Sequence, residues 1–330
     1  MKKLFAKKVS LTVIAFVLVA VLAACGAEPT PTPTTPAATP TPAPTATPTR
    51  AAPTPTPTPA GFANPDLLVD TSWLAQRLND ANIRIVDART AKDYQAGHIQ
   101  GAVNLPVADT FNPVGPAQDV GPAAQLEQVF GQRGISGDTR VIVYDNGKET
   151  TAARVLWTLE YYGNTKGAVL DGGFKKWQKE AKTISTEETK ATAAKFTAQV
   201  RPSIFASKDD VLAALKKPSV AIVDARSPAE YKGDDLRAKR GGHIPGAVNI
   251  DWTTLFTSDD AAVLKPFAEI RKMYEDAGVT KDKDVFVYCQ THQRSSVSYL
   301  TLRLLGYDKV HGYDGSWAEW GNDPDVPIEK

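Results

Sequence analysis

The chain has 330 residues, of which 42% are hydrophobic and only two are cysteine. Its 38 Lys and Arg residues nearly balance its 37 Asp and Glu residues, so the formal net charge is +1 at pH 7. This balance excludes the concentrated basic footprint of a nucleic-acid-binding protein, and no nucleic-acid partner is expected.

Residues 1–24 have the pattern of a secretory signal peptide. Four lysines come first, an apolar run covers 11–22, and two alanines precede Cys25. A basic head, an apolar middle and small residues before the cleavage point are typical of such leaders. The position of Cys25 resembles the bacterial lipoprotein box, which implies that this cysteine carries lipid and begins the mature chain. A transmembrane anchor is the alternative, but the apolar run is shorter than the roughly 20 residues of a span.

Residues 25–60 are predicted to be a tether. From residue 29 onward they are nearly all Pro, Thr and Ala, with Arg50 as the only charge. Such a segment cannot bury a core, and it favours an extended, partly polyproline-like chain. We therefore expect an extracytoplasmic protein that is anchored by lipid to a bacterial cell membrane. With Cys25 taken by lipid, Cys289 has no cysteine partner and stays a free thiol.

The remaining residues contain one unit twice. Ile-Val-Asp-Ala-Arg occurs at 85–89 and again at 222–226, and the eight residues 97–104 return with few changes at 242–249. Two further pairs match by position, 141–145 with 285–289 and 170–174 with 313–317. Because the offset stays between 137 and 145, we interpret the repeat as a duplicated domain rather than a solenoid. The expected domains are 61–182 and 204–330, with 183–203 as the linker.

Each copy alternates short apolar strands with helical patterns. Continuous apolar strands that alternate with helices predict an α/β fold, in which each domain is a mostly parallel sheet with helices on both faces. The elements expected in the second copy are helices at 208–215, 266–277 and 295–305, and strands at 220–224, 247–250, 285–288 and 310–313.

Cys289 lies at the end of the strand 285–288, and a helix is expected from Ser295. In parallel sheets, ligands bind at the carboxyl ends of the strands. A thiol in a loop that opens a helix meets backbone N–H groups and the positive end of the helix dipole, which stabilise a thiolate and favour a bound anion. The alternative is a cysteine that serves only as a small buried apolar residue.

These motifs resemble the rhodanese family in its tandem-domain form, the thiosulfate sulfurtransferases. The resemblance covers about Leu68 to the C-terminus. In that family only the second copy is catalytic, and here Asp145 takes the place of the nucleophile while Thr150 replaces the loop arginine. The family's marks in the second copy are Val-Asp-Ala-Arg, Gly-His-Ile-Pro-Gly-Ala, Val-Tyr-Cys with a six-residue loop, and Asp-Gly-Ser-Trp.

The resemblance implies a double displacement. The Cys289 thiolate would take the outer sulfur of thiosulfate, release sulfite, and pass the sulfur of the resulting persulfide to cyanide or a thiol. The small-molecule donor and acceptor are then the partners, no cofactor is expected, and the chain is expected to be a monomer. The resemblance also implies that Arg154 reaches across the domains to the substrate anion; the alternative is a helix-surface arginine. The other candidate substrate-binding residues form the loop: Gln290, Thr291, His292, Gln293 and Arg294.

Several polar residues have competing interpretations. Arg294 either binds the anion or is solvated, and His292 either handles a proton or is exposed at the loop tip. Ser295 and Ser296 are expected to cap the helix. The following residues occur in both copies and are interpreted as structural: His243 and His98, and the network of Asp224, Arg226 and Glu230 with its counterpart at Asp87, Arg89 and Asp93. Four histidines and one thiol build no metal site of familiar spacing.

Three rival functions remain. A cysteine phosphatase needs five residues between its cysteine and arginine, whereas four separate Cys289 from Arg294. The second rival is a non-catalytic sulfur-carrying or binding module at the membrane surface. The presence of Cys289 together with Arg294 argues against it. With 3-mercaptopyruvate as donor, the family uses neutral, glycine-rich loops, whereas this loop is polar.

Overall fold

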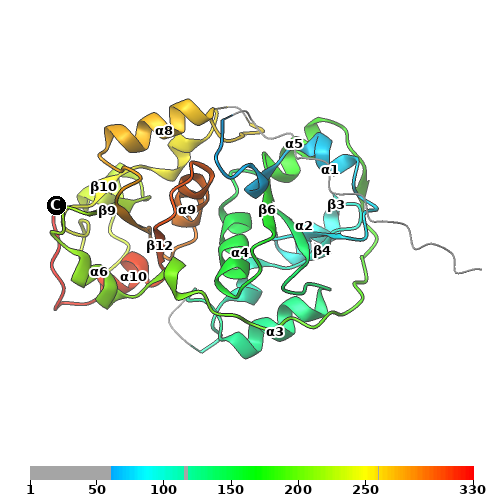
Figure 1. The fold of residues 1–330 in the computed structure, drawn as a ribbon, viewed down its shortest axis with the longest axis horizontal. Coiled ribbons are helices and arrows are strands. Elements are labelled where there is room, and N and C mark those ends of the chain that lie inside the picture. Colours follow the sequence, from blue (N-terminus) through cyan, green and yellow to red (C-terminus); the bar gives the residue numbers. More distant parts are fainter. Residues whose placement is uncertain (1–60, 115–117, 259) are drawn as a thin grey trace, which may run out of the picture. The chain divides into compact units, whose positions relative to one another are not determined.

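The computed structural model describes residues 61–114, 118–258 and 260–330. The predicted signal peptide, the predicted lipidation site Cys25 and the predicted tether all lie outside the described residues. All the described residues belong to one compact unit. Within it, the elements of the first copy are followed along the chain by those of the second (Figure 1).

The first copy is built on a five-stranded sheet in the order β1-β6-β5-β2-β4, with every neighbouring pair parallel. The central strand β5 is buried over most of its length, which agrees with its continuous apolar sequence. The strands are β1 (Leu68–Val69), β2 (Ile83–Asp87), β4 (Val103–Asn104), β5 (Arg140–Tyr144) and β6 (Gly167–Leu170). The helices are α1 (Thr71–Ala75), α2 (Ala91–Ala96), α3 (Ala123–Gln132), α4 (Thr150–Tyr161) and α5 (Gly173–Lys179).

The second copy repeats this arrangement with the parallel order β8-β12-β11-β9-β10. The strands are β8 (Phe205–Ala206), β9 (Val220–Asp224), β10 (Val248–Asn249), β11 (Asp284–Tyr288) and β12 (Val310–Tyr313). The helices are α6 (Lys208–Ala214), α7 (Pro228–Lys232), α8 (Phe267–Asp276), α9 (Ser295–Leu304) and α10 (Ser316–Trp320). The predicted fold class is confirmed, and the predicted second-copy elements agree with the structure to within two residues at each end.

Among the residues that the structure describes, the hydrophobic core has three parts. One cluster covers one face of the first sheet and another covers one face of the second. The third cluster contains residues of both copies, among them Leu156 and Trp157 from α4 and Leu300 and Leu304 from α9. These two helices pack against each other (Figure 1). The copies therefore share buried surface, and side chains of the first copy can reach the loop of the second that contains Cys289.

The segment between the copies is ordered against the first copy. β7 (Ile184–Ser185) pairs antiparallel with β3 (His98–Ile99). Further along, Phe196 is buried and packs its ring on Phe130 of α3. Four short 3-10 helices complete the fold of the described ranges: η1 (Pro65–Leu67), η2 (Val107–Thr110), η3 (Pro202–Ile204) and η4 (Trp252–Leu255).

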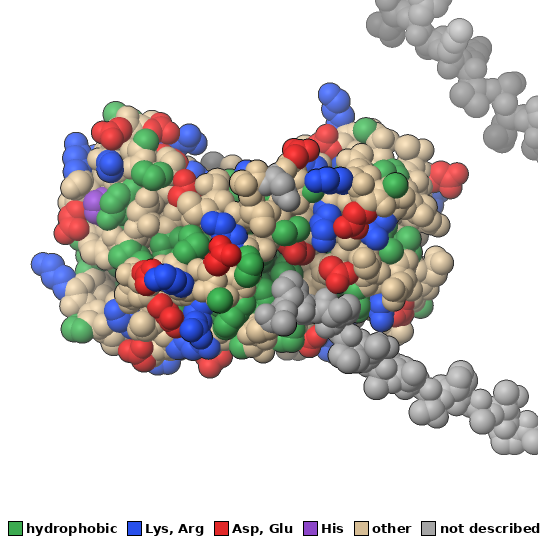
Figure 2. Space-filling model, turned by 90° about the horizontal axis from the view of Figure 1, so that it is seen from above, with side chains coloured by type: hydrophobic (Ala, Val, Ile, Leu, Met, Phe, Trp, Pro, Cys, Tyr) green, Lys and Arg blue, Asp and Glu red, His purple; other side chains and the backbone are tan. Residues whose placement is uncertain are grey.

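On the face drawn in Figure 2, acidic and basic side chains are interspersed and do not gather into one basic field. Of the helices in the described ranges, none is both long and apolar enough to cross a bilayer.

Candidate active site

Cys289 directly follows β11, the middle strand of the second sheet, and the loop that it opens ends where α9 begins. The residue forms no disulfide and is only 1% exposed. Gln290, Thr291, Gln293 and Arg294 are partly exposed around it. The thiol is therefore enclosed by its own loop at the carboxyl edge of the sheet, which is where ligands bind in parallel α/β folds.

The loop is held by the start of α10. The Ser316 hydroxyl accepts hydrogen bonds from the backbone N–H groups of Cys289 (3.3 Å) and His292 (3.0 Å), and it donates to the Tyr313 carbonyl at 2.8 Å. The Trp317 N–H donates to the Cys289 carbonyl. The sequence identifies Asp-Gly-Ser-Trp as a motif of the family but assigns no role to Ser316. The contact between Ser316 and Cys289 joins residues 27 positions apart, so the local sequence carries no signal of it.

Several backbone N–H groups of the loop donate no hydrogen bond to the described residues. Those of Thr291, Gln293 and Ser295 have no hydrogen-bond acceptor among the residues that the structure describes. His292 adopts a left-handed conformation (φ 55°), which curls the loop back on itself. Successive N–H groups in such a turn form a concave site for an anion.

Arg294 is fixed by a buried carboxylate. Its Nη1 and Nη2 donate to the two carboxylate oxygens of Glu230 at 2.7 and 2.8 Å. Glu230 lies on α7, and the two residues form a bidentate ion pair. Burial lowers the pKa of Arg294, but the hydrogen bond to Glu230 and the charge of Cys289 raise it by more. Conversely, burial raises the pKa of Glu230, but Arg294 outweighs it and brings this pKa to about 2. The guanidinium is therefore a permanent positive charge beside the sulfur.

A second arginine joins the same carboxylate. Arg226 and His243 are 17 positions apart, whereas Arg89 and His98 are 9 apart, so the second copy has eight extra residues here. This insertion places Arg237 Nε 3.4 Å from Glu230 Oε1, with about half of the Arg237 side chain exposed. Gln290 Nε2 donates to the Arg237 carbonyl. Glu230 thus contacts two guanidinium groups, and Arg237 also pairs with Asp235 at 3.1 Å, so the charges of this cluster balance. The sequence prediction did not single out Arg237.

His292 is fully buried, so the interpretation as an exposed loop-tip residue is wrong. Its Nδ1 is hydrogen bonded to Ser295 Oγ at 2.8 Å, while its Nε2 has no partner among the described residues. Burial, with the nearby charge of Arg154, lowers its pKa well below 6.5, so the ring is neutral at pH 7. The ring packs edge-on against Trp157 of the first copy, with 4.6 Å between centroids.

The capping prediction for the two serines is wrong. The residue before α9 is Arg294, and it makes no side-chain cap. The Ser295 hydroxyl is hydrogen bonded to the His292 ring, and the Ser296 hydroxyl donates to the His292 carbonyl at 2.6 Å. Both serines therefore orient His292 instead of capping the helix.

Arg154 lies on α4 and is fully buried, so the interpretation as a helix-surface arginine is wrong. It does cross to the second copy, where Nη1 lies 2.5 Å from Asp314 Oδ1. Nη2 donates to the Gln118 carbonyl. Its charge is thus compensated by Asp314, and its contact with a substrate anion stays a prediction.

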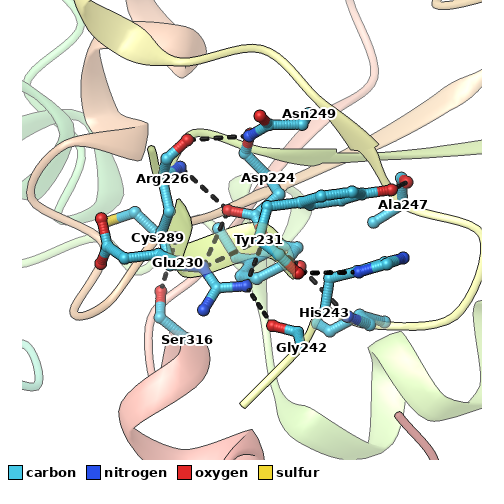
Figure 3. A network of polar contacts seen from close by, with 12 residues as sticks. Asp224, Arg226, Glu230, Tyr231, Gly242, His243, Ala247, Asn249, Cys289 and Ser316 are labelled. Carbon is cyan, nitrogen blue, oxygen red and sulfur yellow. Dashed lines mark hydrogen bonds and ion pairs between the residues drawn. The ribbon is translucent and has the colours of Figure 1, made fainter. Parts of the chain in front are cut away.

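The structural interpretation of the duplicated residues agrees with their contacts. Arg226 pairs with Asp224 and donates to the Gly242 carbonyl, and Asn249 donates to the carbonyls of Asp224 and Arg226 (Figure 3). The first copy repeats these contacts with Asp87, Arg89, Gly97 and Asn104. His243 and His98 each stack on a tyrosine with centroids 3.7 Å apart. Glu230 is the exception in the predicted network, because it pairs with Arg294 instead.

In the first copy, the equivalent loop is filled by its own side chain. The carboxylate of Asp145 accepts hydrogen bonds from the N–H groups of Gly147 (2.7 Å), Glu149 (3.2 Å), Thr151 (3.0 Å) and Ala152 (3.3 Å). The same backbone shape therefore binds an anion in one copy and presents unused N–H groups beside a thiol in the other. No cluster of three or more metal-binding side chains occurs in the described ranges.

A profile of the rhodanese-like domain matches the chain twice, at residues 70–180 and 207–323. The fold and the site thus define a protein with two rhodanese domains, of which the second has the cysteine. The chain belongs to the rhodanese family, and its resemblance to the tandem-domain form is confirmed.

Two curated relatives match nearly their whole length. Thiosulfate sulfurtransferase of Azotobacter vinelandii is 37% identical over 269 residues, which cover 81% of this chain and 98% of the relative. Sulfur carrier protein TtuD of Thermus thermophilus is 37% identical over 285 residues, covering 82% and 99%. Among solved structures, the anaerobic ergothioneine biosynthesis enzyme of Chlorobium limicola superposes with a TM-score of 0.74 at 23% identity, over 82% of this chain and 71% of that one. That likeness concerns the fold.

Proposed function

We propose that this protein is a thiosulfate sulfurtransferase that works through a persulfide on Cys289. The observation that carries the proposal is the thiol enclosed by unused loop N–H groups and by Arg294. The rhodanese family and the relatives named thiosulfate sulfurtransferase support the same reaction.

In the first half-reaction, the Cys289 thiolate attacks the outer sulfur of thiosulfate. A sulfur–sulfur bond forms on the enzyme, the one in thiosulfate breaks, and sulfite leaves with the electron pair. Arg294, fixed by Glu230, attracts the dianionic donor. The N–H groups of Thr291, Gln293 and Ser295 then stabilise the negative outer sulfur of the persulfide.

In the second half-reaction, cyanide or a thiolate attacks the outer sulfur and the Cys289 thiolate is the leaving group. Splitting the transfer into two displacements is covalent catalysis, and it predicts ping-pong kinetics. The neutral His292 supplies no charge in either step; with Ser295 it sets the shape of the loop.

The test is to treat the purified protein with thiosulfate alone. Mass spectrometry should show one added sulfur, about 32 Da, on the peptide with Cys289, and cyanide should remove it. Cys289→Ser should show neither adduct nor turnover, because a serine hydroxyl without a base is a much weaker nucleophile. Turnover by Cys289→Ser, or faster reaction with 3-mercaptopyruvate or a phosphate ester than with thiosulfate, would overturn the proposal.

For localisation, we propose that the mature chain is a monomer that begins at lipidated Cys25 and is tethered to a bacterial cell membrane on its extracytoplasmic side. The lipid anchor and the location are supported by the sequence pattern of residues 1–60. Intact mass of detergent-extracted protein should include the lipid, and Cys25→Ala should be released or left unprocessed. An unmodified soluble wild-type chain would contradict this.

A further inference from the structure

The first copy has a cavity of about 290 Å³ at the carboxyl ends of β2 and β5, the place that corresponds to the thiol site of the second copy. Arg89, Asp93, Asp145, Asn146 and Thr150 are among the residues that line it. Its volume is close to the lower limit, roughly 300 Å³, of small-molecule sites. The sulfur-transfer mechanism uses none of these residues.

The charges that line the cavity are unbalanced. Arg89 forms an ion pair with Asp87, with 2.6 Å between Arg89 Nη2 and Asp87 Oδ2. Asp145 is surrounded by backbone N–H groups, and burial raises its pKa although these hydrogen bonds oppose the change. Asp93 forms no ion pair with any Lys or Arg in the described ranges, and its carboxylate accepts only from the Thr90 hydroxyl at 2.7 Å. Two carboxylates therefore line this space, and Arg89, the cation that lines it with them, is already paired with Asp87.

The second copy shows what a carboxylate at this position binds. Glu230 occupies the place of Asp93, and it holds the Arg294 guanidinium in a bidentate pair. Thr150 occupies the place of Arg294. The shorter threonine removes both the positive charge and the volume of the guanidinium, so the first copy keeps the acceptor while it lacks the donor.

We infer that the first-copy cavity binds a small organic cation through a guanidinium or ammonium head group. The head group takes the place that Arg294 fills in the second copy and donates hydrogen bonds to the Asp93 carboxylate. Asn146 and Thr150 offer further oxygens at the wall. A planar guanidinium fits a carboxylate bidentately, so it should bind more tightly than an ammonium group. Thiosulfate is excluded by the two carboxylates.

The test uses agmatine, which carries a guanidinium and an ammonium group, with putrescine, methylurea and thiosulfate as comparison ligands. Calorimetry on the purified wild-type protein should give binding of agmatine, weaker binding of putrescine, and none of methylurea. Thiosulfate is titrated into Cys289→Ser, which has no thiol to react, and it should not bind this site. Amide chemical shifts should change in the loop 145–151. Asp93→Asn should weaken agmatine binding at least about tenfold.

Thr150→Arg should abolish the binding, because the introduced guanidinium would fill the cavity itself. Asp138→Asn is the matched control: it removes a carboxylate of the same copy that is 91% exposed and outside the cavity, and it should leave the affinity unchanged. Equal affinity in the wild type and Asp93→Asn, or no binding to the wild type at about 10 mM agmatine, overturns the inference. If Thr150→Arg does not fold, Asp93→Asn and the chemical shifts decide the question.

Discussion

The loop that begins at Asp145 and the loop that begins at Cys289 follow equivalent central strands and lead into equivalent helices. In the first loop, the Asp145 carboxylate accepts hydrogen bonds from four backbone N–H groups. In the second, the N–H groups of Thr291, Gln293 and Ser295 have no acceptor among the described residues. A turn that gathers N–H donors at a helix start needs an anion, because unpaired donors are costly away from water. The comparison teaches that one copy supplies this anion from its own sequence, while the other leaves the place open beside a thiol.

The largest effect is expected when the second loop is made like the first. Cys289→Asp should lower turnover with thiosulfate and cyanide at least about 1000-fold, because no nucleophile remains. Its melting temperature should stay the same or rise, because the new carboxylate can accept the free N–H groups and lies beside Arg294. Steady-state kinetics and thermal unfolding measure both. A strongly destabilised Cys289→Asp would show that the two loops do not share an anion site.

A smaller effect is expected when only the arginine is replaced. Arg294→Thr, which copies Thr150, should reduce kcat/KM for thiosulfate by about 10- to 100-fold, because the fixed charge beside the donor is lost. It also leaves Glu230 buried without its bidentate partner, at a cost of about 3 kcal/mol at pH 7, the lower end for a broken buried pair because Arg237 stays 3.4 Å away. Arg271→Thr removes an exposed arginine on α8 and is the control. Unchanged thiosulfate kinetics in Arg294→Thr would contradict the assigned role.

The same variant should change the response to acid. The folded pKa of Glu230 is about 2, below its ordinary 4.5, so its ionised form stabilises the protein above pH 4.5. That contribution is lost as the pH falls from 4.5 toward 2. Arg294→Thr should therefore lose less stability over this interval than the wild type. Urea unfolding at pH 7, 4.5 and 3 measures the difference, and parallel curves for the two proteins would contradict the pairing.

The smallest effect is expected from the converse change in the first copy. Asp145→Cys in a Cys289→Ser background places a thiol in the first loop, next to Thr150 instead of an arginine and facing Asp93. Sulfur uptake from thiosulfate should stay at least about 100-fold slower than at Cys289, because a dianion is repelled there. Mass spectrometry over time measures the uptake. Rapid persulfide formation would show that the nucleophile alone distinguishes the copies.

Much of the fold could be predicted because its signals are local. The apolar strands, the helical stripes and the repeat of Ile-Val-Asp-Ala-Arg lie in the sequence itself, and they placed Cys289 at the carboxyl end of a strand. The linker shows the limit. Its polar composition did not reveal that Phe196 is buried against Phe130, since burial there depends on a surface formed by distant residues.

The sequence by itself determined the repeat, the α/β class, the one thiol in the folded body and the four-residue spacing to Arg294, because chain order and side-chain period carry this information. The tertiary structure alone decided which partners the charged groups take. It paired Arg294 with Glu230 and Arg154 with Asp314, and it buried His292 against Trp157. These contacts join segments 64 to 160 residues apart, and their strength depends on distance, burial and competing hydrogen bonds, none of which is written in the local sequence.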